Sequence, residues 1–317
     1  MIDFRYLVVT IISIFLALTV GIMLGAGFVG DPLARDLEDR IKTVQNEVNQ
    51  QREQIDQLRA QNRTLTEWTQ AVEPWAVEGR LDGENVVLFT VDGADGGVID
   101  GTLTALEGAG ANVVTQINLT PKLALESQPE ADQLATIVES VGAEPSDVRM
   151  DAAAALGEGA ASLALDGDGT IEEGGGSAQV AYSELLRLLE EEDFVSVARN
   201  SDEGDVVPSG SSFVIAGGNA TTQPFEVPAF VSRLGSELTA GETDVVVTES
   251  SSSQWDMVQA VREDDEINET VSTVDTGENA LGHVALVLVL DASPDTPAGH
   301  FGTDDGSSLL PEPPPDE

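Results

Sequence analysis

The side chains that could do chemistry are few in this chain of 317 residues. It contains two histidines, His283 and His300, and no cysteine. A Ser-His-Asp triad would have to use one of these histidines, and the nucleophile-elbow pattern GxSxG is absent from the sequence. Without cysteine there is no thiolate nucleophile, no thiolate metal site and no disulfide. The sequence therefore predicts that the protein is not an enzyme.

Oxygen and nitrogen ligands offer few candidates for a bound ion or cofactor. Residues 92–97 (DGADGG) follow an apolar run but lack GxGxxG, and they place carboxylates where a phosphate needs hydrogen-bond donors. Residues 166–173 hold oxygen ligands suited to Ca²⁺ but do not keep the EF-hand spacing, so an acidic solvated loop is favoured. His283 begins an apolar run and is interpreted as structural. His300, in the segment 299–302 (GHFG), is the candidate to meet a partner or a metal.

The charge balance excludes several classes of partner. Asp and Glu number 57 against 14 Lys and Arg, which gives a formal net charge of -43. Such a surface repels nucleic acid and anionic lipid. It also suits a chain exposed to high salt, where screening removes the self-repulsion, and we favour this interpretation over an acidic ligand site.

A membrane anchor is predicted at the N-terminus. The run from Tyr6 to Val29 has no charged side chain, and a helix of that length rises ~36 Å, enough to cross a ~30 Å hydrocarbon core. A secretory signal peptide is the alternative, but it needs a shorter apolar core and a small-residue cleavage site. Arg5 precedes the run and acidic residues follow it, so the N-terminus is expected in the cytoplasm and the rest of the chain outside.

A parallel two-stranded coiled coil is predicted over residues 34–69, which makes a homodimer the expected state. With Ile41 at position a, β-branched residues and one Asn fill the a positions, and Leu fills several d positions, a pattern typical of dimers. The GxxxG spacing in the anchor allows close helix packing. The alternative is an amphipathic helix lying on its own domain. The predicted interface comprises Gly21, Gly25, Ile41, Val44, Val48, Gln51, Ile55, Leu58, Asn62 and Leu65. The helix is expected to end before Pro74, with Trp68 and Trp75 as candidates to pack the stalk onto the next domain.

Alternating apolar runs and helical patterns after the stalk predict an α/β domain with a mostly parallel sheet. Strands are expected at residues 85–91, 111–117, 212–216, 244–248 and 283–290, and helices at 97–108, 179–194, 228–238 and 254–262, with one or two more within 123–168. A ligand crevice is expected where parallel strands end, in the loops 92–97, 217–221 and 249–254.

The predicted organisation has four parts. They are a transmembrane anchor (1–30), a coiled-coil stalk (31–73), an α/β globular domain (82–292) and a polar, Pro-rich tail (293–317). The Gly-rich, acidic linker 166–177 is predicted to be a mobile loop within the domain.

Several segments resemble one known family. Residues 15–25 (FLALTVGIMLG) followed by a coil, the strand 86–89 (VVLF), the segment 271–275 (VSTVD) before a terminal apolar run, and GHFGT at 299–303 with Leu310 and Pro311 are similar to the actinobacterial copper transporter family typified by mycobacterial MctB. The similarity extends over nearly the whole chain in the same order. It implies a cell-envelope protein named for copper efflux and described as an outer-membrane channel, while the residues indicate one helix in the cell membrane. Copper is accordingly the possible ligand, with His300 as the candidate residue.

Two functional hypotheses remain open. In the first, the protein supports copper efflux or homeostasis. In the second, it is a non-enzymatic dimeric scaffold that presents the α/β domain to an envelope partner and regulates cell division or peptidoglycan hydrolysis, as implied by a cell-division relative of similar architecture. A copper-sensitive deletion strain would support the first hypothesis, and chained cells would support the second.

Overall fold

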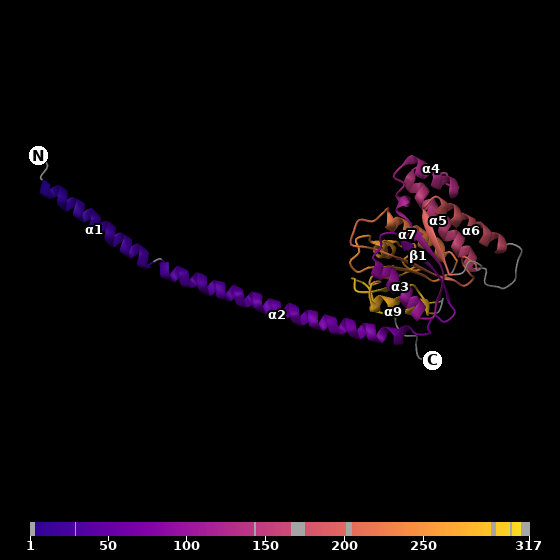
Figure 1. The fold of residues 1–317 in the computed structure, drawn as a ribbon, viewed down its shortest axis with the longest axis horizontal. Helices are drawn as coiled ribbons and strands as arrows, with labels where there is room; N and C mark the ends of the chain where they lie inside the picture. The colour runs from indigo at the N-terminus through magenta and orange to yellow at the C-terminus, as the bar shows by residue number, and fades with distance from the viewer. Residues whose placement is uncertain are drawn as a thin grey trace. The chain divides into compact units, whose positions relative to one another are not determined.

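The computed structural model describes residues 4–28, 30–142, 144–165, 175–200, 205–241, 243–292, 296–304 and 306–311. It divides into two compact units, residues 1–67 and 68–317 (Figure 1). The calcium-like stretch 166–173 and the Pro-rich end at 312–317 lie outside the described residues.

The described residues of the first unit are helical. Helix α1 (Phe4–Phe28) is the one described helix long and apolar enough to cross a membrane, over Phe4–Gly25 with a mean hydropathy of 2.8. Its large apolar side chains are exposed, as expected of a segment whose apolar groups face lipid. One described helix of membrane-spanning length at the N-terminus agrees with the sequence prediction. Helix α2 (Gly30–Val77) follows and continues into the second unit.

The expected end of α2 before Pro74 is wrong, because the helix continues to Val77. The backbone N–H of Glu78 donates to the carbonyl of Pro74, which keeps the last turn closed. Val77 is buried in the core of the second unit and anchors that turn. Gly79, with φ +71°, then turns the chain away, a conformation that costs glycine little.

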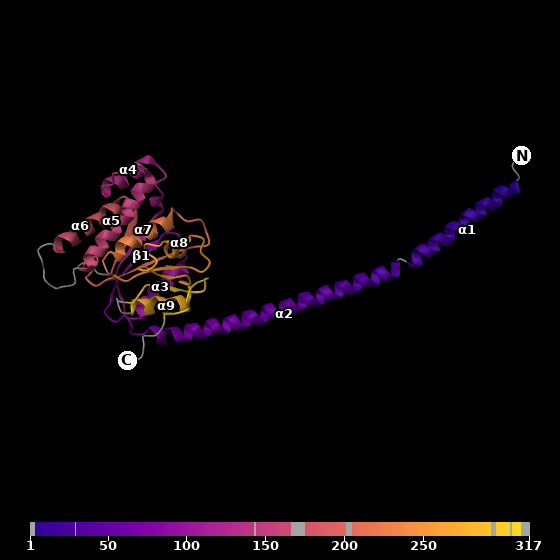
Figure 2. The same ribbon diagram turned by 180° about the vertical axis from the view of Figure 1, so that it is seen from behind.

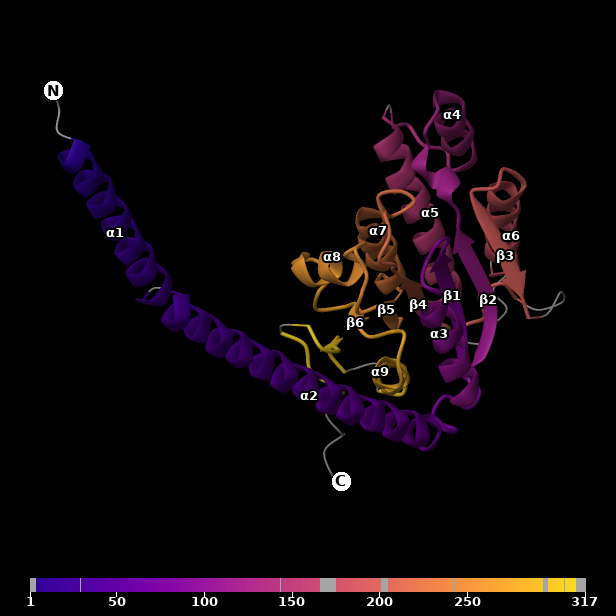
Figure 3. The same cartoon turned by 60° about the vertical axis from the view of Figure 1, so that its left-hand side comes forward.

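The second unit contains a seven-stranded sheet with the order β3-β2-β1-β4-β5-β6-β7. Neighbouring strands are parallel except for β3, which runs antiparallel to β2 at the edge. Figure 3 shows this order from β6 across to β3. The strands are β1 (Asn85–Val91), β2 (Asn112–Leu119), β3 (Val195–Arg199), β4 (Ser212–Gly217), β5 (Val245–Glu249), β6 (Ser272–Val274) and β7 (His300–Phe301). The predicted mixed α/β fold with a mostly parallel sheet is therefore confirmed.

Helices cover both faces of this sheet. Helices α3 and α9 lie on one face, and α4, α5, α6 and α7 lie on the other (Figures 1 and 2). Strand β1 supplies Val86 and Leu88 to one core cluster and Val87 and Phe89 to the other, so the strand is buried on both sides. The helices are α3 (Gly96–Gly108), α4 (Gln128–Ile137), α5 (Pro145–Leu165), α6 (Gly175–Glu191), α7 (Val227–Thr239), α8 (Met257–Glu263) and α9 (Ala280–Leu290), with a 3₁₀ turn, η1, at Pro121–Ala124.

The strand predicted over 283–290 is wrong, because these residues belong to helix α9. A continuous apolar run does not distinguish a buried strand from a buried helix. The deciding residue precedes the run: the side chain of Asn279 accepts from the backbone N–H groups of Leu281 and Gly282 and caps the helix. The edge of the sheet beyond β5 is formed by the short strands β6 and β7.

Candidate functional site

The predicted crevice loops follow three neighbouring strands, β1, β4 and β5. Hydrogen bonds connect these loops to one another. The backbone N–H of Asp95 donates to the carbonyl of Gly218 at 2.8 Å, and Asn219 Nδ2 donates to the carbonyl of Gly93 at 2.8 Å. The N–H of Gln254 donates to the carbonyl of Asn219 at 2.9 Å. The structure thus brings the three loops together and uses their polar groups to hold one another.

Carboxylates in these loops also accept hydrogen bonds from backbone N–H groups. Asp95 caps α3 by accepting from the N–H of Gly97. Glu249, 4% exposed at the end of β5, accepts from Ser253 Oγ and from the N–H of Val258 at 2.9 Å. Burial raises the pKa of Glu249, and the hydrogen bonds from Ser253 and Val258 partly oppose this. The sequence prediction located this loop but did not single out Glu249.

His300, the predicted metal-binding residue, lies on β7 in a polar network. Its Nδ1 is 2.9 Å from Thr273 Oγ1 on β6, and Arg262 Nε donates to the same oxygen at 2.9 Å. Because Arg262 supplies the hydrogen on its side, the Thr273 hydroxyl can donate its own hydrogen to His300. Burial lowers the pKa of His300, and the nearby Arg262 guanidinium lowers it further. This environment favours the neutral imidazole.

Asp275 holds the C-terminal segment beside the same network. Its side chain is 4% exposed and accepts from Arg262 Nη2 at 3.0 Å. It also accepts from the N–H of Thr303 at 2.7 Å, from the N–H of Asp304 and from Ser307 Oγ. The segments VSTVD and GHFGT, separated in sequence, therefore meet as neighbouring strands. His300 and Phe301 form a strand inside the stretch expected as a tail.

His283 lies on α9 and contacts the last turns of α2. Its Nδ1 is 2.6 Å from Glu73 Oε1, and its Nε2 is 3.2 Å from the carbonyl of Gly277. Both side chains of the pair are mostly buried. The two histidines thus lie at different places in the fold. His300 is on the edge strand β7, and His283 contacts the last turns of α2. Among the described residues, no group of three or more His, Asp or Glu side chains is arranged to hold a metal ion.

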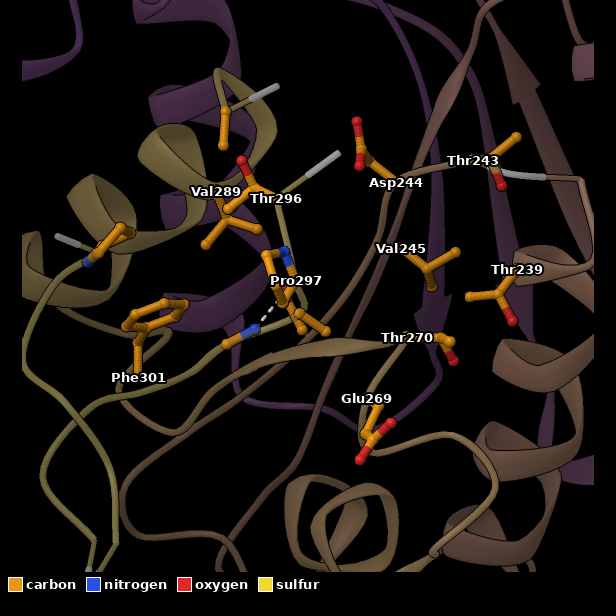
Figure 4. A pocket seen from close by; sticks show the side chains of 15 residues that line it. Thr239, Thr243, Asp244, Val245, Glu269, Thr270, Val289, Thr296, Pro297 and Phe301 are labelled. Carbon is orange, nitrogen blue, oxygen red and sulfur yellow. Dashed lines mark hydrogen bonds between the residues drawn. The ribbon is translucent and has the colours of Figure 1, made fainter. Parts of the chain in front are cut away.

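A cavity of about 530 Å³ lies at the amino ends of β5 and β6, at the opposite edge from the crevice loops. Figure 4 shows Asp244, Glu269 and Phe301 on separate sides of it. Burial raises the pKa of Asp244, and the negative charge of Glu84 adds to the effect. No predicted site residue lines the cavity, because the predicted ligand crevice lies at the carboxyl ends of the strands.

The predicted dimer residues lie in the first unit, and in the single chain they are exposed. The exposed fraction of the apolar stripe on α2 ranges from 38% at Val48 to 64% at Leu58 and Leu65. A Cβ atom added at Gly21 or Gly25 would meet nothing within 4 Å. The described structure therefore shows this stripe as exposed side chains along α2.

Comparisons with known proteins agree with the resemblance seen in the sequence. A family model described as "Copper transport outer membrane protein, MctB" matches residues 1–311. The chain is 24% identical over 323 aligned residues to a protein named "Copper transporter MctB" from Mycobacterium tuberculosis and to one of the same name from Mycobacterium bovis. Each alignment covers 97% of this chain and 98% of the relative. The family is named for copper transport and not for an enzyme activity. The chain belongs to the MctB family of copper transport proteins.

Proposed function

We propose that this protein supports copper efflux or homeostasis from the cell envelope. The observation that carries the proposal is the family match over residues 1–311, which includes both the anchor and the globular unit. In this proposal α1 anchors the chain in the cell membrane with its N-terminus in the cytoplasm, because Arg5 precedes the apolar run and acidic residues follow it. The globular unit is then on the outer side, and copper is the cargo of the system.

Direct copper handling would involve His300 in this proposal. Imidazole is a good ligand for copper, whereas the carboxylates that dominate this chain suit harder ions. The His300 Nδ1 atom already contacts Thr273, so copper binding at Nδ1, one of the two ring nitrogens, would require that hydrogen bond to break. The proposal has two forms. In one the chain itself binds copper, and in the other it supports an assembly that exports copper.

A copper titration of the purified full chain in detergent, beside the His300→Ala variant, separates these forms. It is carried out with Cu(II), and with Cu(I) under reducing conditions. Stoichiometric binding that the variant loses would support direct handling. Weak adsorption that is equal in both proteins would contradict direct handling and leave the supporting role.

A second candidate function is the dimeric envelope scaffold. It is favoured by the exposed apolar stripe of α2, whose heptad spacing is typical of a parallel coiled coil. In this proposal the stalk pairs two chains and presents their globular units to an envelope protein, with an effect on cell division or peptidoglycan hydrolysis. Deletion would then produce chained cells without a change in copper tolerance, and light microscopy of the deletion strain tests this.

A further inference from the structure

Two tryptophans and a valine form an exposed ridge on the last turns of α2. Trp68 is 62% exposed, Val72 is 38% exposed and Trp75 is 87% exposed. The spacings of four and three residues place all three side chains on one face of the helix. We call Trp68, Val72 and Trp75 the tryptophan ridge. Trp68 and Trp75 were candidates to pack the stalk onto its own domain, and their exposure shows that they do not.

A different face of the same turns contacts the globular unit of the same chain. Glu73 pairs with His283, and Val77 is buried in the core. Thr69 and Ala76, which occupy a positions when Ile41 is an a position, are half-buried. The a positions of this stretch therefore face the chain's own globular unit, so a regular a/d seam does not extend unchanged to the end of α2.

The tryptophan ridge continues the apolar stripe of the stalk on the remaining face. It follows Leu65 at spacings of three, four and three residues, which keeps Leu65, Trp68, Val72 and Trp75 in one stripe. The two tryptophans repeat at the seven-residue period of the stalk. A change of spacing from four to three at one point is a stammer, which locally overwinds a coiled coil without ending it.

We propose that the tryptophan ridge is a contact between two copies of this chain, which extends the subunit interface of the stalk up to the globular units. The inference rests on the proposed pairing of the stalk helices. An aromatic side chain buries about 150–250 Å² in an interface, so two tryptophans contribute a substantial part of the ~800 Å² per partner in a standard interface. An apolar contact also suits two chains that each carry a net charge of -43 and repel one another elsewhere.

The absence of cysteine allows a direct test with single-cysteine variants of the full chain in detergent. Val72→Cys reports on the ridge and Leu58→Cys reports on the stalk seam. Glu67→Cys, at an outward f position, is the matched control. After oxidation with diamide, non-reducing gels should show disulfide-linked dimers for Val72→Cys and Leu58→Cys, at least fivefold more abundant than for Glu67→Cys.

The outcomes separate the ridge from the stalk. If Leu58→Cys forms dimers and Val72→Cys stays at the level of Glu67→Cys, the stalk pairs and the ridge inference is overturned. If only Val72→Cys forms dimers, two chains meet at the ridge without a paired stalk, and the inference that the ridge extends a stalk interface is overturned. If neither forms dimers, both are overturned.

A charge placed on the ridge provides a second measurement. Trp75→Arg combined with Val72→Cys should reduce disulfide formation at least threefold, because an arginine resists burial in an apolar contact. The same Trp75→Arg change combined with Leu58→Cys should leave more than half of the dimer. Equal yields with and without Trp75→Arg in the Val72→Cys chain would overturn the inference.

Discussion

Glu73 Oε1 lies 2.6 Å from His283 Nδ1, and this contact joins the end of α2 to α9. The other ring nitrogen of His283 is 3.2 Å from the carbonyl of Gly277. A Cβ added at Gly101 of α3 would lie 2.3 Å from His283 Nε2, so α3 approaches the ring closely. His283 is therefore held between α2, α3 and the loop before α9.

We expect Glu73→Ala to destabilise the second unit by about 1–3 kcal/mol, because a mostly buried ring nitrogen of His283 would lose its partner. The measurement is urea unfolding of the full chain in detergent, followed by near-ultraviolet circular dichroism. Glu78→Ala is the control, since Glu78 is exposed on the neighbouring turn. Equal losses in the two variants would mean that the pair contributes no specific stability.

Position 302 requires glycine because the side chain of Asp275 leaves no room for a Cβ atom there. Its φ is +133°, and an added Cβ would lie 1.8 Å from Asp275 Oδ1. We expect Gly302→Ala to lower the free energy of unfolding by about 2 kcal/mol or more, through backbone strain and displacement of the carboxylate. Gly306→Ala is the control, because Gly306 has φ +90° but nothing within 4 Å of an added Cβ.

The control should lose only the strain, about 1 kcal/mol. Limited proteolysis gives an independent readout, since cleavage within the segment 299–308 should accelerate in Gly302→Ala. Equal protease resistance of Gly302→Ala and Gly306→Ala would contradict the role assigned to Asp275.

His300 makes stability depend on pH in a definite direction. Its folded pKa is lowered by burial and by Arg262, whereas an unfolded histidine titrates near ~6.5. Below that pH the unfolded chain binds a proton that the folded chain resists, so this contribution to stability is present above ~6.5 and is lost as pH falls toward the folded pKa. The His300→Asn variant should therefore lose less stability than the parent chain between pH 7.5 and pH 5.

The comparison must be made as a difference between the two chains, because Glu249 and Asp244 titrate in the opposite sense. The difference in stability between the two chains is measured from their urea unfolding midpoints at matched pH values. A constant difference between the chains over this pH range would contradict the assignment of a neutral His300 in the fold.

Glu249 should contribute the opposite slope. Burial raises its folded pKa above the ordinary value of 4.5, so its contribution to stability is present below that value and is lost as pH rises through the folded pKa. Glu249→Gln keeps an acceptor for the N–H of Val258 and removes the buried charge. We expect the stability of this variant relative to the parent chain to increase from pH 4 to pH 7. Exposed Glu266→Gln is the control and should show no such trend; a flat profile for Glu249→Gln would contradict the buried-charge explanation.

The sequence predicted the parts of the fold whose signals are local. The buried strand 85–91 and the helix 179–194 were recognised because apolar runs and amphipathic spacing are strong at those positions, and the structure places β1 and α6 there. The segment 283–290 was misassigned because its run is apolar on every side, and the cap at Asn279 was overlooked. Strands β6 and β7 were missed because they are short and depend on contacts between distant parts of the chain. Arg262 donates to Thr273 of β6 and to the carbonyl of Phe301 of β7, and Asp275 accepts from the N–H of Thr303.

The candidate site was predicted less completely than the fold. His300 was singled out by residue type, but its contact with Thr273 depends on strand pairing that no local pattern reveals. The three crevice loops were placed correctly at the ends of neighbouring strands, whereas the hydrogen bonds that close them depend on tertiary structure. The cavity at the amino ends of β5 and β6 gave no sequence signal, since its lining comes from segments far apart in the chain.

Copper tolerance of a strain that lacks this protein tests the central claim most directly. Growth and cell-associated copper are measured over a range of added copper, with the full chain restored on a plasmid as the control. We predict reduced growth and raised copper content in the deletion strain, both corrected by the full chain. Unchanged growth and unchanged copper content would contradict a role in copper efflux or homeostasis.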